Sequence, residues 1–225
     1  MASSIDKACR QVWPRQCGLP EGRFAAGRVV IPRIARAVGL LAVAVVGLGM
    51  SAIYAPSAWG QSPEEGDQRR EYNVKLAYLC NFARYVTLPA DAAAARTNGE
   101  WIIGVLGEDP FGGTLDRLTA SGRKIAGRTI VARHFASLDD YKRCHVLFIT
   151  KTIPPKQQEA AIQAMRGKPV LLVGEIDEFA AKGGCVNFYL DEDNVRFEIN
   201  IDALKEQHIE ASSKLLSLAK IVKQP

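Results

Sequence analysis

The chain has 225 residues and a formal net charge of +5 that is unevenly distributed along it. Residues 1–60 hold 7 Lys/Arg and 2 Asp/Glu of the 29 and 24 in the whole chain, so residues 61–225 hold 22 of each and have no net charge. A neutral domain lacks the basic surface that nucleic acids and acidic membranes attract, which argues against both as partners. The length after residue 60 suits one domain with a sizeable core.

The first 60 residues have the pattern of a leader. Residues 37–55 form an uncharged apolar run that follows three arginines between residues 28 and 36, and small Ala58 and Gly60 come after it. This order is typical of a secretory signal, so we expect export and cleavage near Gly60. An uncleaved membrane anchor is the alternative, because an apolar run of this length can span a bilayer.

Three cysteines follow the leader, namely Cys80, Cys144 and Cys185. Export implies an oxidising compartment in which disulfides persist. An odd number allows one internal pair and leaves one thiol over. Neither a CxxC motif nor a Cys/His metal spacing occurs, so the sequence predicts no metal site.

The chain after the leader starts with a polar stretch and an apolar helix. Residues 61–71 are polar and predict a flexible linker, which places the start of the domain at residue 72 and its end at residue 225. Residues 74–86 contain few polar side chains and predict a helix that is buried on most sides or offers apolar surface to a partner. We expect Pro89 to stop this helix.

The middle of the chain has the pattern of an α/β fold. Continuous apolar runs at 101–107, 145–150 and 169–176 indicate parallel strands covered on both faces, and the alternating stretch 128–135 indicates a strand nearer the edge. Helices are predicted over 110–121, 155–166 and 177–184. This order predicts a mostly parallel open sheet flanked by helices on both faces.

The last part of the chain has a different pattern. Residues 185–190 and 194–201 alternate on either side of an acidic Asp-Glu-Asp turn and predict an antiparallel hairpin. A long final helix over 203–222 is predicted, with Asp202 as its N-cap and His208 on its buried stripe.

The sequence contains no motif that predicts a catalytic residue or a cofactor site. The stretch "GVLGEDPFGG" at 104–113 follows a strand, but it is not GxGxxG, no Walker lysine follows, and its acidic residues would repel a phosphate. Turn glycines explain it, although open sheets do bind small ligands at this position. The nucleophile motif GxSxG is absent, and the three histidines after the leader lie on separate predicted elements.

The stretch "VRFEIN" at 195–200 places three polar side chains, Arg196, Glu198 and Asn200, on one face of a strand. In one interpretation an Arg–Glu pair lies in solvent and Asn200 ties the strand to the next helix, and the pair adds little stability. In the other, this face meets a partner protein, with Phe188 supplying aromatic surface of the kind found in interface hot spots. The residues alone leave both open.

Taken together, these pieces resemble the YfiR/HmsC-like periplasmic family over roughly residues 72–223. The resemblance is carried by stretches in matching order, with "YNVKLAYLCNFARYV", "IGVLGEDPFGGTLDRL", "GRTIVARHF", "CHVLFIT" and "PVLLVGE" followed by "GGCVNFYLDEDNVRFEINIDAL". It implies a periplasmic regulator without catalytic residues. Such proteins bind and repress a membrane diguanylate cyclase, and an outer-membrane lipoprotein can sequester them, which raises cyclic di-GMP and favours biofilm.

The resemblance also implies residue roles. Glu198 foremost, then Arg196, Asn200 and Phe188, match the closing hairpin of the family and are expected to be partner or structural determinants. A disulfide between Cys144 and Cys185 is the pairing we expect, because each begins a predicted strand. Whether the chain forms a homodimer is left open.

A periplasmic small-ligand sensor that uses the crevice beside residues 107–112 is the alternative function, and an α/β enzyme is a third.

Overall fold

A computed structural model describes residues 63–89 and 99–223, so the leader lies outside the described residues. Their elements are α2 (Pro63–Tyr85), β1 (Val86–Thr87), β2 (Glu100–Leu106), α4 (Thr114–Ala120), β3 (Lys124–Ile125), β4 (Arg128–Phe135), the 3₁₀ turn η1 (Leu138–Asp140), β5 (Val146–Ile149), α5 (Pro155–Met165), β6 (Leu171–Gly174), β7 (Val186–Asp191), β8 (Asn194–Asn200), α6 (Ile201–Glu206), β9 (Glu210–Ala211), α7 (Ser213–Leu216) and β10 (Lys220–Val222).

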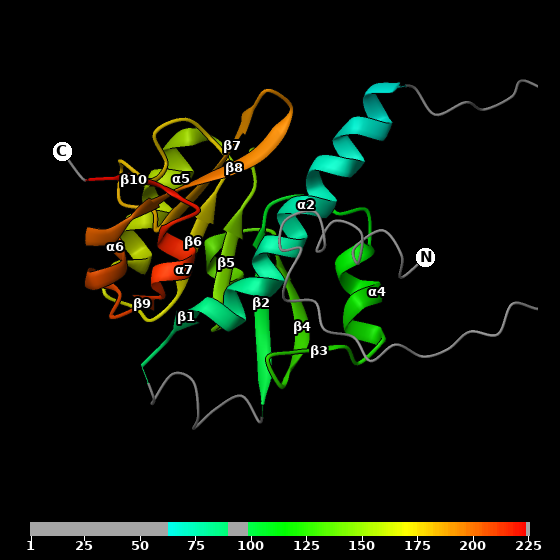
Figure 1. The fold of residues 1–225 in the computed structure, drawn as a ribbon, viewed down its shortest axis with the longest axis horizontal. Helices are drawn as coiled ribbons and strands as arrows, with labels where there is room; N and C mark the ends of the chain where they lie inside the picture. Colours follow the sequence, from blue (N-terminus) through cyan, green and yellow to red (C-terminus); the bar gives the residue numbers. More distant parts are fainter. Residues whose placement is uncertain (1–62, 90–98, 224–225) are drawn as a thin grey trace, which may run out of the picture.

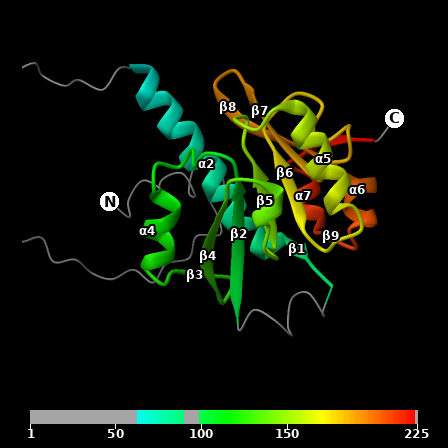
Figure 2. The ribbon, with the colours of Figure 1, turned by 180° about the vertical axis from the view of Figure 1, so that it is seen from behind.

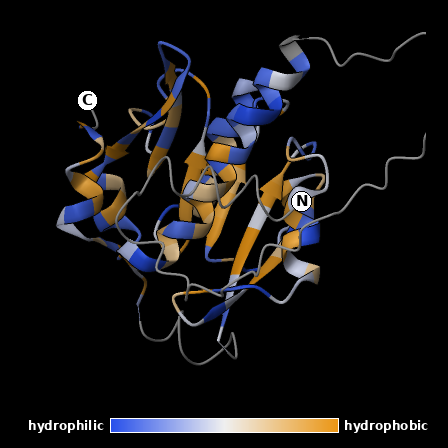
Figure 3. Ribbon diagram, turned by 45° about the vertical axis from the view of Figure 1, so that its right-hand side comes forward, coloured by the Kyte–Doolittle hydropathy of each residue, from blue (hydrophilic) through white to orange (hydrophobic). Residues whose placement is uncertain are grey.

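The predicted α/β architecture is confirmed. In the described residues an eight-stranded sheet has the order β10-β8-β7-β6-β5-β2-β4-β3, and β1 pairs with β9. Strands β4, β2, β5, β6 and β7 run parallel, whereas β8 returns antiparallel to β7. Helix α2 crosses one face of the sheet and α5 covers the other (Figures 1 and 2). The central strands are apolar because helices cover both of their faces (Figure 3).

Helix α2 is buried along its second half, as the apolar composition of residues 74–86 predicts. From residue 74 to residue 85 only Val74, at its start, and Arg84 are not buried. The polar side chain of Asn81 is 6% exposed and donates a hydrogen bond to the carbonyl of Ala77 one turn back, which satisfies its amide inside the core. The helix begins at Pro63, so residues 63–71 form its first turns and are not the flexible linker that their polarity predicts.

The predicted helix at 177–184 is wrong, since this segment forms consecutive turns. Its conformation is set by Phe179, whose ring occupies the space that side chains on Gly174 and Gly184 would need. A Cβ added at these glycines would come within 2.4 and 2.1 Å of the ring. Because the chain must close over the ring in this way, it does not continue as a helix.

The long final helix is also wrong. Helix α6 ends at Glu206, His208 has a left-handed backbone with φ of 57°, and Ser212 starts the new short helix α7 by accepting a hydrogen bond from the N–H of Leu215. His208 is therefore exposed in a connection and does not lie on a buried helical stripe. The chain then adds β10 to the sheet beside β8.

Candidate partner-binding site

The hairpin of β7 and β8 is formed as predicted, with a two-residue turn. Asp191 pairs with Asn194, and Glu192 and Asp193 between them both have positive φ, of 46° and 63°. Two left-handed central residues define the type I′ turn, whose twist suits a tight hairpin. This turn fixes the register and therefore decides which side chains share a face.

One face of the hairpin belongs to the core. Phe188 lies directly opposite Phe197, and each is 1% exposed. Helix α2 supplies Tyr78, 5.1 Å from Phe197 between ring centroids, and Phe82, which stacks on Phe188 at 6.3 Å. Phe188 therefore lies in the core and not on the surface, so the expected aromatic contact with a partner is a structural one within this chain.

The opposite face of the hairpin is polar and partly open. Arg196 is exposed and lies 3.4 Å from Asp191, between Nε and Oδ2. Glu198 is 15% exposed and accepts a 2.8 Å hydrogen bond from Lys220 of β10. This bond raises the pKa of Lys220. Arg196 and Glu198 thus bond to neighbouring strands instead of to each other, and both remain at the surface.

Asn200 has a structural position. It is 0% exposed, and its Oδ1 accepts hydrogen bonds of 3.0 Å from the N–H groups of Asp202 and Ala203. Its Nδ2 donates to the carbonyl of Ala180 at 2.7 Å. Asn200, rather than Asp202, is therefore the N-cap of α6. Of the four predicted contact residues, only Arg196 and Glu198 are placed where a partner can touch them.

The structure does not contain the expected Cys144–Cys185 bridge, because both thiols are free and buried. The two residues precede β5 and β7, and β6 lies between these strands. Two strand spacings amount to about 10 Å, which exceeds the roughly 7 Å that a disulfide spans. Burial raises the pKa of each thiol to about 12, and Cys185 donates a hydrogen bond to Gln207.

The strand carboxyl ends form the crevice that a small ligand would use. Strands β4 and β5 lie on opposite sides of β2, so the ends of β2 and β5 flank the topological switch point. At Gly107 an added Cβ would meet the hydroxyl of Thr150 at 2.3 Å and that of Thr152 at 2.7 Å. The Asp109 carboxylate accepts hydrogen bonds from the N–H groups of its own loop. The Thr150 and Thr152 side chains therefore take up the space beside Gly107.

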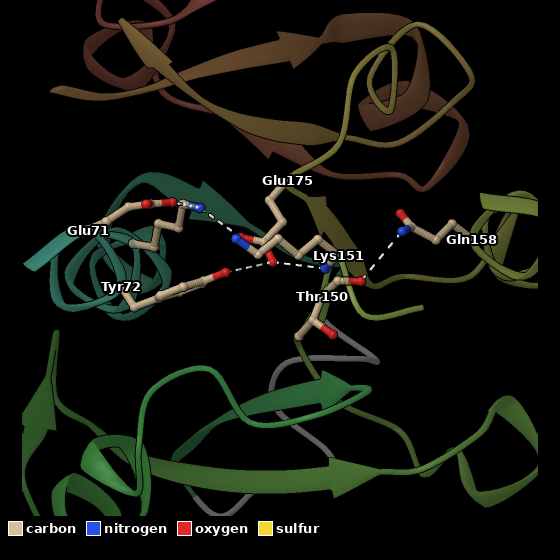
Figure 4. Close-up of polar contacts among 7 residues, drawn as sticks. Glu71, Tyr72, Thr150, Lys151, Gln158 and Glu175 are labelled. Atoms are coloured by element: carbon tan, nitrogen blue, oxygen red, sulfur yellow. Dashed lines mark hydrogen bonds and ion pairs between the residues drawn. The ribbon is translucent and has the colours of Figure 1, made fainter. Parts of the chain in front are cut away.

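A buried charge cluster that the sequence pattern does not predict lies beside this point (Figure 4). Glu175 follows β6, and its side chain is 1% exposed. It accepts hydrogen bonds from Lys75 at 2.7 Å, from the hydroxyl of Tyr72 at 3.3 Å and from the N–H of Lys151 at 2.9 Å. Lys75 also pairs with Glu71.

This cluster joins α2 to the ends of β5 and β6. Burial and the neighbouring Glu175 carboxylate raise the pKa of Tyr72, so its hydroxyl stays protonated and acts as a donor. The available signal in the sequence is Lys75 itself, a charged residue on an apolar helix one turn after Glu71, because a buried lysine requires an acidic partner.

Other chemistry is limited in the described part of the chain. Residues 63–89 and 99–223 contain no group of three or more His, Cys, Asp or Glu side chains arranged to hold a metal ion. None of the helices described for these residues is long and apolar enough to cross a membrane.

Comparison with known proteins gives one informative match. A model of the YfiR/HmsC-like family matches residues 72–220. No curated protein matches the chain significantly. A solved structure described as a conserved domain protein from Vibrio cholerae O1 biovar eltor shares 14% identity, with a TM-score of 0.39. The alignment covers 68% of this chain and 60% of that one, so this chain spans less than two thirds of that protein's length.

Proposed function

Because the chain belongs to the YfiR/HmsC-like family, we propose that it binds the periplasmic domain of an inner-membrane diguanylate cyclase and represses that enzyme. The family match over residues 72–220 carries this proposal, since the family implies a periplasmic regulator of a diguanylate cyclase in general. Repression lowers cyclic di-GMP and with it biofilm output. The protein acts by binding, not by catalysis, and an outer-membrane lipoprotein relieves repression by sequestering it.

The contact surface we propose is the polar face of the β7–β8 hairpin. Arg196 supplies an exposed guanidinium, and Glu198 supplies a carboxylate that is 15% exposed and bonded to Lys220. Arginine is enriched in interface hot spots, and charged rim residues steer association. Asn200 and Phe188 support this surface from inside, by capping α6 and by packing against α2.

A binding experiment tests the proposal. The tagged chain is expressed from its own start, recovered from the periplasmic fraction and titrated against the periplasmic domains of the host's membrane cyclases. We expect one domain to bind, and we expect Arg196→Ala and Glu198→Gln to weaken binding while leaving the unfolding midpoint nearly unchanged. Lys205→Ala, at an exposed residue of α6, is the control. Absence of binding to every domain would contradict the proposal.

The alternative function, a periplasmic small-ligand sensor, has less support. Thr150 and Thr152 occupy the space beside Gly107, and the N–H groups of Phe111 and Gly113 bond to Asp109. A ligand pocket needs converging polar groups that are free to bind. Here the Asp109 carboxylate is already bonded within its own loop, and the Thr150 and Thr152 hydroxyls bond to each other.

A further inference from the structure

At one edge of the described eight-stranded sheet, only the second half of strand β8 is paired with an outer strand. On one side the sheet ends in β3, a strand of two residues, Lys124 and Ile125, and very short edge strands of this kind resist pairing with other chains. On the other side β10 pairs with Glu198–Asn200 of β8. The preceding part of β8, residues 194–197, has β7 as its one strand neighbour within the described residues.

The surroundings of residues 194–197 have a distinct chemistry, and we call these residues the open edge of β8. On one face, Leu190 is 52% exposed and lies opposite the partly buried Val195. Beyond it, the turn has three successive acids, Asp191, Glu192 and Asp193, all exposed. Arg196 pairs with Asp191, whereas Glu192 and Asp193 have no ion-pair partner among the described residues. The open edge of β8 therefore combines backbone groups that no neighbouring strand in the described residues pairs with, the apolar pair Leu190 and Val195, and an excess of negative charge.

We propose that the open edge of β8 accepts an extended segment of the partner protein as an added strand. The segment carries basic side chains beside Glu192 and Asp193 and apolar side chains over Leu190 and Val195. Strand addition obtains affinity from main-chain hydrogen bonds and specificity from alternate side chains, which is the combination that this edge offers. The inference rests on the proposed function and specifies how the cyclase domain is held.

Charge argues against a second copy of this chain as the occupant. Two open edges of β8 related by a twofold axis would each bring the same acidic turn of residues 191–193, so a second copy would not compensate the excess of negative charge at this edge. A basic partner segment has the opposite effect.

Hydrogen exchange of the bound protein tests the mode of binding. We expect backbone amides within residues 194–197 to exchange at least about tenfold more slowly in the complex with the cyclase periplasmic domain. The amides of β3, at the far edge, serve as the internal control and should not change. Binding without protection of residues 194–197 would overturn strand addition while leaving the proposed function intact. No binding to any cyclase domain would overturn both.

A turn variant tests the charge requirement without loss of the fold. The double substitution Glu192→Asn and Asp193→Gly gives the Asn-Gly pair that type I′ turns favour, so the hairpin is expected to be at least as stable. It removes the two unpaired acids. We expect affinity to fall roughly fivefold and its salt dependence to decrease. Unchanged affinity and salt dependence would contradict a basic partner segment.

Discussion

At the scale of single residues, His145 is an ionisable group buried in the core. His145 is 3% exposed, stacks on Trp101 at 5.0 Å and accepts a 2.9 Å hydrogen bond at Nδ1 from the N–H of Ile102. Its Nε2 has no hydrogen-bond partner within residues 63–89 and 99–223. Burial, together with nearby Arg128 and Arg133, lowers its pKa to about 4.

This lowered pKa predicts acid sensitivity. The folded state favours the neutral imidazole, whereas the unfolded chain takes up a proton near the ordinary pKa of about 6.5. The contribution of His145 is therefore complete above about pH 6.5 and is lost as the pH falls to about 4, which lowers the free energy of unfolding by about 3 kcal/mol in all. Urea unfolding across this range measures it. His145→Gln keeps an acceptor for Ile102 and should lack this step; identical pH profiles would contradict the assignment.

Lys75 and Glu175 form a buried ion pair whose two members should depend on each other energetically. Lys75→Met leaves the buried Glu175 without its cation, so we expect the free energy of unfolding to fall by about 3–5 kcal/mol. Adding Glu175→Gln removes the stranded charge and keeps an acceptor for Tyr72 and Lys151, so the double variant should recover part of the loss. Urea unfolding of the two single variants and the double variant measures this coupling. Strict additivity would contradict a coupled buried pair.

At the scale of elements, the hairpin is held by its aromatic contact with α2. Phe188→Ala should cost about 3–5 kcal/mol, because the ring is buried between Phe82, Phe148 and Tyr78. Leu190→Ala, two residues on along the same strand and 52% exposed, should change stability by less than about 0.5 kcal/mol. Thermal or urea unfolding compares the two. A similar effect of both substitutions would contradict this placement of Phe188 in the core.

The sequence predicts an element most reliably where the element is buried on both faces or on every second residue. Parallel strands β2, β5 and β6 are recognisable because coverage on both faces requires continuous apolar runs, and the hairpin because its alternation surrounds an acidic turn. The final segment could not be predicted in this way. Leu204 and Leu215 are spaced as on one helix, but Leu204 lies on α6 and Leu215 on α7, and both are buried. The left-handed backbone at His208 between them is a local choice that periodicity does not reveal.

The candidate site was predicted only in part for a related reason. Alternation shows which side chains share a face, but not which face a distant helix covers. The two-residue turn places Phe188 opposite Phe197, so the aromatic residue expected at the surface shares the buried face. Arg196 and Glu198 are at the surface as expected, whereas the buried Glu175 depends on Lys75, 100 residues earlier in the chain.

At the scale of the whole molecule, the features proposed for partner binding lie at one end of the sheet. The hairpin tip and the first turns of α2 extend from the end where the parallel strands finish, and both are hydrophilic (Figures 1 and 3). The buried Lys75–Glu175 pair fixes α2 to this end, and the Tyr78 and Phe82 rings fix the hairpin to α2. The molecule therefore presents the hairpin on a rigid support, which suits a binding regulator.

The measurement that tests repression most directly is cyclic di-GMP in cells. We expect deletion of the gene to raise cyclic di-GMP, re-expression of the natural chain to lower it again, and the Arg196→Ala variant to restore repression only in part at equal protein level. Cyclic di-GMP that is unchanged by deletion under several growth conditions would contradict the account.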